Sequence, residues 1–185
     1  MNFNKHLELE GSHAFLGASK YHWLNYSDDK LAETYKNYLA VERGTRLHAL
    51  AKEHIELGIK MPKTRTTLNM YINDCIGYDM TPEQVLYYSP NVFGTTDAIK
   101  FSKKLLRVFD LKTGFNQASM NQIKIYDAIF CLEYKVNPFD ISYDNRIYQF
   151  DDIFTEEIDA HEIRDIMDRA IRFDKIVEEI KAGVR

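Results

Sequence analysis

The sequence predicts an α/β fold, with a mixed central β-sheet flanked by helices and a helix-rich N-terminal part. Helical periodicity dominates before residue 80, three strand-like segments follow, and the pattern helix, strand, helix completes the chain. With 185 residues, 45% hydrophobic and 13% aromatic, the chain can bury a sizeable core. We therefore expect a single domain over residues 1–185.

The N-terminal part is expected to be mostly helical. Residues 1–12 are polar and predict an extended start. Ser19 is a candidate N-cap for an aromatic helix that contains Trp23. Residues 28–59 then predict a long helix, with a break or a closely packed turn at Gly44.

A shorter helix is expected before the sheet. Residues 64–78 have apolar side chains at helical spacing, and the sheet is expected to begin after them at 81–88. Two further strands carry Asp97 and Asp110. The polar segment 102–104 between them is expected to form a hairpin turn that folds one strand back onto the other.

The C-terminal part is expected to add a helix, a strand segment and a final helix. Ser119 is a candidate cap for a helix that reaches about residue 134. Residues 139–150 predict a hairpin or an edge strand with its turn at Asp144-Asn145. An amphipathic helix is expected over 155–181, capped by Thr155 or Asp159.

Two acids and a lysine mark the predicted strands. Side chains alternate along a strand, so Asp110 and Lys112 project to one side, about 6–7 Å apart. The hairpin brings Asp97 beside them. Magnesium prefers oxygen ligands, which Asp97, Asp110 and the Leu111 carbonyl would supply. A metal held there would activate water, Lys112 would orient that water or stabilise charge on a phosphate, and the group predicts phosphodiester hydrolysis.

The helix after these strands carries Gln122 and Tyr126. They are four residues apart and share one face. An amide and a phenol on that face would contact the scissile phosphate or a nearby base. A tyrosine on an amphipathic helix is also an ordinary core residue with a solvated hydroxyl, and this alternative stays open.

The motifs occur in an order that resembles a known superfamily, over roughly residues 13–150. The chain resembles the RecB-like and phage exonuclease branch of the PD-(D/E)XK nucleases. The resemblance rests on G-x-x-x-H at Gly44–His48, G-x-x-D at Gly94–Asp97, D-x-K at Asp110–Lys112 and Q-x-x-x-Y at Gln122–Tyr126.

This resemblance implies a restriction-endonuclease-like core and a metal-dependent deoxyribonuclease. The expected activity is that of a phage-type exonuclease in recombination, replication or repair. It implies Mg²⁺ or Mn²⁺ as cofactor, and an imidazole ligand makes manganese an effective alternative. The implied metal ligands are His48, Asp97, Asp110 and Leu111, and the implied catalytic residues are Asp97, Asp110, Lys112, Gln122 and Tyr126.

Glu83 is a further candidate for the site. Some relatives place a glutamate on the strand before the G-x-x-D motif, where it helps to bind a second metal. Glu83 occupies a comparable position, but it is equally compatible with a plain strand edge.

DNA is the expected partner, although the net charge is −4. Basic residues gather around the proposed site and predict a local basic groove, whose alternative is a solvated charged face. These residues are Lys100, Lys103, Lys104, Arg107, Lys112 and Lys124. In related phage exonucleases, residues like Ser19 and Lys20 hold a terminal phosphate. The candidate nucleic-acid-binding residues are Ser19, Lys20, Lys104, Lys124 and Arg146.

Cysteine usage and hydropathy bound the compartment. Cys75 and Cys131 lie in apolar helical patterns without a C-x-x-C partner, so we expect buried, reduced thiols and no internal iron–sulfur cluster. No segment has the apolar length of a membrane helix, and none resembles a signal peptide. We therefore expect a cytoplasmic protein without a membrane partner.

Two other function classes remain open at this stage. The first is a nucleic-acid-binding or protein-binding module that uses the same fold without cleaving. The second is a structural or partner-inhibiting phage protein. A homo-oligomer or a recombination partner protein is compatible with any of these. The intact set of Asp97, Asp110 and Lys112 favours the nuclease. Buried like charges repel and cost stability, and a protein without catalysis has little reason to keep them.

Overall fold

The computed structural model describes residues 4–183 of the chain. Their contacts divide the chain into two units, and the boundary between Arg43 and Gly44 falls within helix α1 (Asp28–Leu57). The prediction of one domain over residues 1–185 stays a prediction. Among the described residues, no helix is long and apolar enough to cross a membrane.

The first unit contains two short 3₁₀ helices, Leu7–Leu9 and Ala18–Asn25, and the start of α1. The Phe15 ring packs against Tyr35, with ring centroids 4.9 Å apart. The prediction that Ser19 caps a helix is wrong, because the N-cap position is Gly17 and no side chain caps the helix. Trp23 is partly buried and donates to the Gly17 carbonyl at 3.2 Å.

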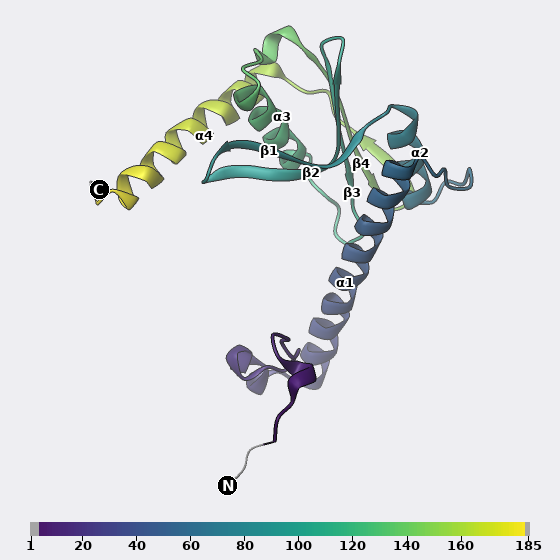
Figure 1. Cartoon of the computed structure of the whole chain (residues 1–185), viewed down its shortest axis with the longest axis vertical. Helices are drawn as coiled ribbons and strands as arrows, with labels where there is room; N and C mark the ends of the chain where they lie inside the picture. Colours follow the sequence, from purple (N-terminus) through teal and green to yellow (C-terminus); the bar gives the residue numbers. More distant parts are fainter. Residues whose placement is uncertain (1–3, 184–185) are drawn as a thin grey trace. The chain divides into compact units, whose positions relative to one another are not determined.

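The second unit is built on a five-stranded mixed sheet in the order β1-β2-β3-β4-β5 (Figure 1). β3 and β4 are parallel, and the other neighbours are antiparallel. This confirms an α/β fold with a mixed sheet flanked by helices. The strands are β1 (Thr81–Ser89), β2 (Val92–Ser102), β3 (Leu105–Leu111), β4 (Ser142–Gln149) and β5 (Asp152–Thr155).

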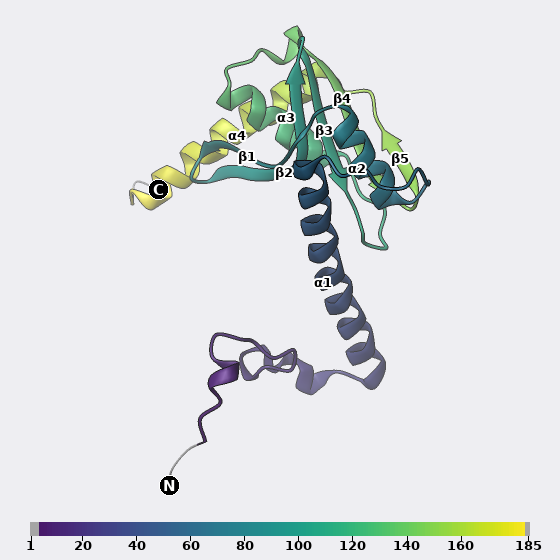
Figure 2. The same cartoon turned by 45° about the vertical axis from the view of Figure 1, so that its right-hand side comes forward.

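Helices cover both faces of the sheet (Figures 1 and 2). One core joins the sheet to α3 (Asn121–Glu133) and α4 (Ala160–Lys181), and includes Leu106, Val108, Ile123, Ile147 and Ile163. The other joins it to α2 (Thr67–Gly77) and the C-terminal part of α1, and includes Ala51, Ile72, Cys75, Phe109 and Tyr148. Removing this apolar surface from water at about 25 cal/mol per Å² is the main stabilising contribution.

The β2–β3 turn confirms the predicted hairpin. Ser102 pairs with Leu105, so the loop holds only Lys103 and Lys104. Both have positive φ, 51° and 62°, as the tight turns that match strand twist require. The two antiparallel strands therefore leave the turn in a fixed register.

The predicted turn at Asp144-Asn145 is wrong. Both residues lie inside β4, a central strand paired with β3 and β5. The real turn is at Phe150 and Asp151, which have φ of 56° and 57°. Asp144 and Asn145 are tolerated in the strand because tertiary hydrogen bonds engage their side chains. Asp144 accepts from Arg107, and Asn145 donates to Asp127 of α3 at 2.6 Å.

Helix ends follow the capping chemistry in part. Of the two predicted caps of α4, Asp159 is the one found, and its Oδ1 accepts from the His161 N–H at 2.8 Å. Ser119 accepts from the Asn121 N–H at 3.2 Å just before α3, although Met120 occupies the N-cap position. Both cysteines are buried and free, as predicted.

Candidate metal centre and active site

Helix α1 delivers His48 to the sheet by a close approach at Gly44. Gly44 is buried, and a Cβ at this position would lie 2.8 Å from the Thr113 hydroxyl just beyond β3. A side chain at Gly44 would therefore require either the helix or the Thr113 side chain to shift. His48 lies one turn further along and shares that face. The structure thus gives the predicted G-x-x-x-H segment a packing reason for its glycine.

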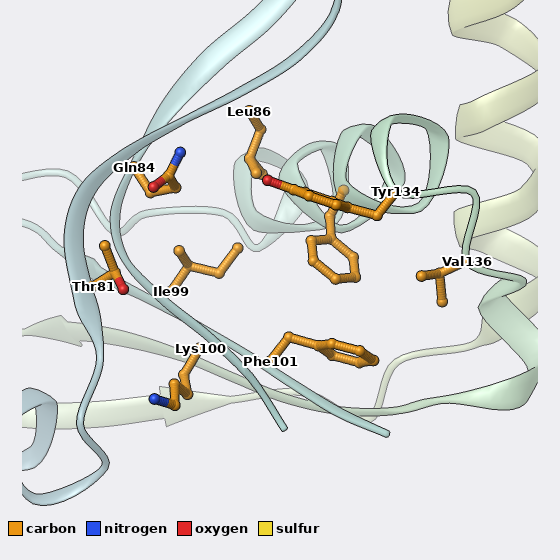
Figure 3. Close-up of a pocket in the computed structure, with 9 residues that line it drawn as sticks. Thr81, Gln84, Leu86, Ile99, Lys100, Phe101, Tyr134 and Val136 are labelled. Carbon is orange, nitrogen blue, oxygen red and sulfur yellow. The ribbon is translucent and has the colours of Figure 1, made fainter. Parts of the chain in front are cut away.

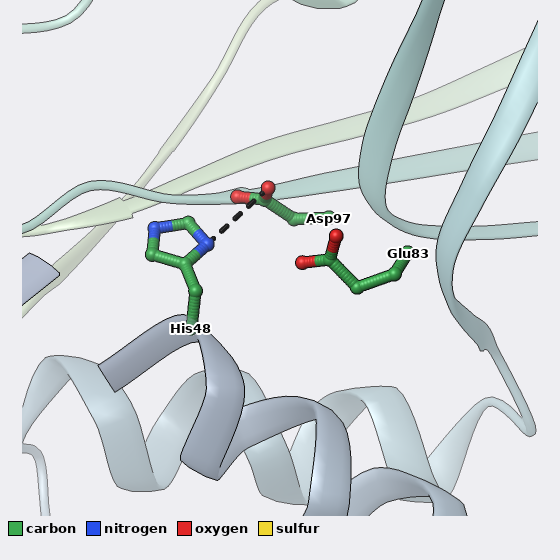
Figure 4. A group of neighbouring side chains, drawn as sticks. All are labelled: His48, Glu83 and Asp97. Atoms are coloured by element: carbon green, nitrogen blue, oxygen red, sulfur yellow. Dashed lines mark ion pairs between the residues drawn. The ribbon is translucent and has the colours of Figure 1, made fainter. Parts of the chain in front are cut away.

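His48, Glu83 and Asp97 converge from α1, β1 and β2 (Figure 4). One ligand atom from each lies within 4.8 Å of the other two. His48 Nδ1 is 3.4 Å from Asp97 Oδ1, and both side chains are only partly exposed. One imidazole and two carboxylates make a donor set suited to a small divalent cation such as Mn²⁺ or Mg²⁺.

Glu83 reaches this group through a strained backbone. Its neighbours Pro82 and Gln84 pair with Ala98 and Thr96, so Glu83 stands opposite Asp97 in the hairpin register. Its φ is 50°, which is uncommon for a residue with a Cβ and costs of order 1–3 kcal/mol. Backbone strain that aims a carboxylate at two other potential ligands favours a functional role over a plain strand edge.

Asp97 also ties the group to the end of β3. Asp97 Oδ2 accepts from the Leu111 N–H at 2.8 Å, beyond the end of the β2–β3 pairing at Ala98 and Phe109. In a strand, the N–H and C=O of one residue point to the same side. The Leu111 carbonyl therefore leaves β3 on the edge that faces Asp97, as a ligand role requires.

Buried Asp110 and partly exposed Lys112 form an ion pair next to this group. Asp110 is only 2% exposed, and Lys112 Nζ lies 2.9 Å from its Oδ2 and 3.1 Å from its Oδ1. Burial and the Asp97 charge raise the pKa of Asp110, while Lys112 lowers it. The Lys112 ammonium therefore offsets part of the increase that burial and Asp97 cause in the pKa of Asp110.

A hydrogen-bonded chain continues from Lys112 to α3. Lys112 Nζ donates to Gln122 Oε1 at 2.8 Å, and Gln122 Nε2 donates to Tyr126 Oη at 3.0 Å. Burial raises the pKa of Tyr126, so its hydroxyl keeps its proton. The structure thus brings the predicted lysine, amide and phenol into one connected set.

His48 has its own electrostatic setting. Its hydrogen bond with Asp97 raises the pKa of the imidazole, against the opposing effect of burial. Asp110 and Glu83 add to the increase. A divalent cation binds the neutral imidazole. It must therefore compete with a proton on His48, which the surrounding carboxylates stabilise.

Gln149 is a residue that the sequence did not single out. It is buried at the end of β4, and its side chain bonds the carbonyls of Gly114 and Asn116 and the N–H of Ala118, all at 2.8–3.0 Å. This loop joins Lys112 to the helix of Gln122. A glutamine in a strand is no signal in sequence, because only the tertiary fold brings it under the loop.

Two of the candidate nucleic-acid-binding residues, Lys124 and Arg146, are engaged in ion pairs. Lys124 is only 7% exposed, and it is bonded to Glu156 at 2.6 Å and Glu162 at 2.9 Å. Arg146 pairs with Asp144 and Asp74. Both positive charges are therefore already paired with carboxylates of the protein.

The remaining three candidates are exposed. Lys104 lies in the β2–β3 turn. Ser19 and Lys20 belong to the first unit, where Lys20 lines a pocket of about 350 Å³ together with Phe15, Trp23 and Tyr38. The structure therefore supplies no continuous basic groove from these residues within the second unit.

A separate apolar pocket of about 570 Å³ lies between the β1–β2 hairpin and the end of α3 (Figure 3). Leu86, Ile99, Phe101 and Tyr134 line it, and none of the candidate metal ligands does. Its only charged lining residue, Lys100, is paired with Asp79 at 2.6 Å. The candidate chemistry therefore lies outside this pocket.

No family model matches the chain, and no curated protein or solved structure matches it either. Its chemistry is accordingly inferred from the residues of the site.

Proposed function

We propose that the protein is a metal-dependent DNA nuclease with a PD-(D/E)XK core, acting as a phage-type exonuclease in recombination, replication or repair. One observation carries this proposal. His48, Glu83 and Asp97, from three different elements, converge beside the buried Asp110 and its partner Lys112. A structural role does not explain two carboxylates gathered around one imidazole beside a third, buried carboxylate, because their mutual repulsion costs stability.

The donor set fits Mg²⁺ or Mn²⁺. His48, Glu83, Asp97 and the Leu111 carbonyl are the residues that would hold the ion, with Asp110 next to them. When bound, such an ion polarises a phosphate and lowers the pKa of a coordinated water. Several carboxylates suit either ion, and the imidazole favours manganese.

The residues of the chain supply the other half of the chemistry. The Lys112 ammonium, fixed by Asp110 and Gln122, is a hydrogen-bond donor that can orient a water or stabilise negative charge on the phosphate. Tyr126 and Gln122 present a phenol and an amide beside it, where they can position the phosphate. Fixed donors of this kind need no reorganisation when charge develops.

The two thiols support a proposal about the compartment. Cys75 and Cys131 are buried and free, and burial raises the pKa of Cys131 to about 11. Two unreactive, unpaired thiols suit a reducing environment. The proposal therefore includes action on DNA in the cytoplasm, which is the host cytoplasm for a phage protein.

The proposal is tested by cleavage of end-labelled linear DNA and closed-circular DNA, with Mg²⁺, Mn²⁺ or EDTA. We expect the wild-type protein to degrade the linear DNA only with metal and to spare the circle. Lys112→Ala should lower the rate by at least about 100-fold, the usual effect of losing one fixed donor. Lys52→Ala is the matched control, since Lys52 lies on α1 with 46% of its side chain exposed.

Three results would count against this proposal. Full activity of Lys112→Ala would remove the catalytic role of the ion pair. Cleavage of the circle would replace the exonuclease by an endonuclease. No cleavage of either DNA by folded, metal-loaded protein would favour a binding module on the same fold.

A further inference from the structure

On the β1–β2 hairpin, the pair of candidate metal ligands Glu83 and Asp97 is followed along the strands by exposed aromatic side chains. The register places Val85 opposite Thr95 and Tyr87 opposite Phe93. Side chains two residues apart along a strand point to the same face. The Asp97 row, the Val85/Thr95 row and the Tyr87/Phe93 row therefore follow one another on one face of the hairpin.

This face is exposed, although its side chains are large and apolar. Phe93 is 60% exposed, and Tyr87 and Val85 are each 48% exposed. The opposite face is used for packing: Leu86 is buried, and a Cβ on Gly94 would lie 2.9 Å from the Tyr126 ring. The hairpin thus covers α3 with one face and leaves its aromatic face without cover among the described residues.

The hairpin is held in place at its tip. Ser89 Oγ donates to Asp174 Oδ1 at 2.6 Å, and Asn91 Nδ2 donates to the same oxygen at 2.7 Å. Asn91 also bonds Glu178, on the next turn of α4. Anchors at the tip and the sheet at the base fix the aromatic row relative to the candidate metal ligands.

The charges of the protein favour base stacking over phosphate neutralisation as the way in which a DNA strand binds to this face. The net charge is −4. Four of the basic residues expected to form a groove, Lys100, Arg107, Lys112 and Lys124, are engaged in ion pairs with acidic side chains. Single-strand-binding proteins combine a basic groove with aromatic side chains on which the bases stack, and the stacking contribution itself needs no such charge. Bases inside a duplex are already stacked and do not offer these faces.

We propose that the Tyr87/Phe93 row is a stacking platform for the bases of a single DNA strand that leads into the metal site. This inference rests on the proposed nuclease function and specifies its substrate as a single-stranded end. Four residues separate Phe93 from Asp97, or about 13 Å at 3.3 Å per residue. At 3.4 Å per stacked nucleotide, the platform holds bases up to about four nucleotides from the scissile phosphate.

The test uses a fluorescent oligo-dT strand and the full chain in EDTA, where no cleavage occurs. Phe93→Ala is expected to weaken binding by about 5- to 150-fold, the range of one lost base–aromatic stack. Phe173→Ala is the matched control, because Phe173 is an equally accessible aromatic on α4, 50% exposed. It should bind like the wild type. Circular dichroism of both variants checks the fold.

A strand with abasic sites makes the test specific. Removing the bases within about four nucleotides of the cleaved end should weaken wild-type binding and leave Phe93→Ala unchanged, because no stack remains to lose. An equal effect of Phe93→Ala on both strands, or no effect on either, overturns the platform. If Phe93→Ala changes the oligomeric state in solution and leaves the DNA affinity unaltered, the platform is also overturned, and the aromatic face is a protein interface.

Cleavage with Mn²⁺ separates this inference from the proposed function. If the wild type cleaves the single strand and Phe93→Ala cleaves it equally well at limiting DNA, the platform fails and the nuclease stands. If the wild type binds the strand through Phe93 and cleaves no DNA, the nuclease fails and the platform stands as a binding surface. A preference for blunt duplex over the single strand contradicts the stated substrate.

Discussion

Gly94 sets the position of the phenol in the candidate site. The Tyr126 ring occupies the space that a side chain at Gly94 would need, with Cε1 2.9 Å from an added Cβ. Tyr126 in turn accepts the hydrogen bond of Gln122, which contacts Lys112. The glycine of the G-x-x-D segment therefore belongs to the site through packing.

We predict that Gly94→Ala displaces the Tyr126 ring and lowers the unfolding free energy by about 1–3 kcal/mol, as overpacking usually does. DNA cleavage should fall with it, because the chain from Tyr126 to Lys112 shifts. Urea unfolding and cleavage rates measure both effects. Gly114→Ala is the control, since nothing lies within 4 Å of an added Cβ there. Equal effects of the two substitutions would contradict this packing role.

Asp127 is a buried acid outside the site. It accepts a hydrogen bond from Asn145 at 2.6 Å, while Asp127 Oδ1 and Asn145 Oδ1 have no hydrogen-bond donor among the described residues. Burial raises the pKa of Asp127 to about 7, against the lowering effects of Asn145 and Lys124. A proton on Asp127 provides the donor that this pair otherwise lacks.

The raised pKa of Asp127 predicts a loss of stability with increasing pH. The folded pKa of about 7 exceeds the ordinary value of 3.8, so the unfolded chain releases the proton first. The contribution of protonated Asp127 to the unfolding free energy is complete below pH 4. It is lost as pH rises to 7, by up to about 4 kcal/mol. Asp127→Asn should match the wild type near pH 4 and be more stable at pH 8. Urea unfolding at both pH values measures this, and a pH-independent difference would refute it.

Most of the individual site residues could be predicted from sequence, because their spacing is local. Asp110 and Lys112 share a face by strand alternation, and Gln122 and Tyr126 share one by helical spacing; both pairs are in contact through Lys112. The position of Glu83 could not be settled in this way. It depends on a positive φ inside a strand, which no local pattern specifies.

At the scale of elements, α4 is joined to α3 by a buried lysine. Lys124 Nζ lies between Glu156 and Glu162. Burial opposes the charged form, but the two glutamates outweigh it and raise the pKa of Lys124. The residue therefore joins the start of α4 to α3, a role that its position in the sequence did not distinguish from DNA binding.

We predict that Lys124→Met lowers the unfolding free energy by about 1–2 kcal/mol, because it leaves two glutamates close together without their cation. The effect is modest since both glutamates are nearly half exposed and screened by solvent. DNA affinity should be unchanged. Unfolding curves and a DNA-binding titration on the same variant measure the two quantities. Weaker DNA binding with unchanged stability would restore Lys124 as a DNA contact.

Elements were predictable where local chemistry specifies them. The β2–β3 turn and the extent of α1 follow from polar turn residues and helical periodicity. The β4–β5 turn was missed because Asp144-Asn145 has turn chemistry that tertiary bonds override. The true turn at Phe150 and Asp151 is stabilised from a distance, as Asp151 Oδ1 accepts from the Thr67 N–H at 2.7 Å.

At the scale of the whole molecule, the second unit carries both the sheet and every candidate metal ligand. The sheet is packed on both faces, and the ligands lie where α1, β1 and β2 meet. Sequence order predicted the mixed sheet and its flanking helices. It could not predict the ion pairs of Lys100, Arg107 and Lys124, because their partners lie 20 or more positions away in the chain.

Manganese binding by the full chain tests the central claim most directly. Titration of Mn²⁺ followed by electron paramagnetic resonance should show a bound ion in the wild type. Asp97→Asn should weaken that binding by at least about 10-fold, since it removes the negative charge of one of the three candidate ligands, the one that contacts His48. Glu56→Gln, an exposed acid on the same helix as His48, should bind Mn²⁺ like the wild type. Equal Mn²⁺ affinity of the wild type and Asp97→Asn, or no binding by the wild type, would contradict the proposed metal centre.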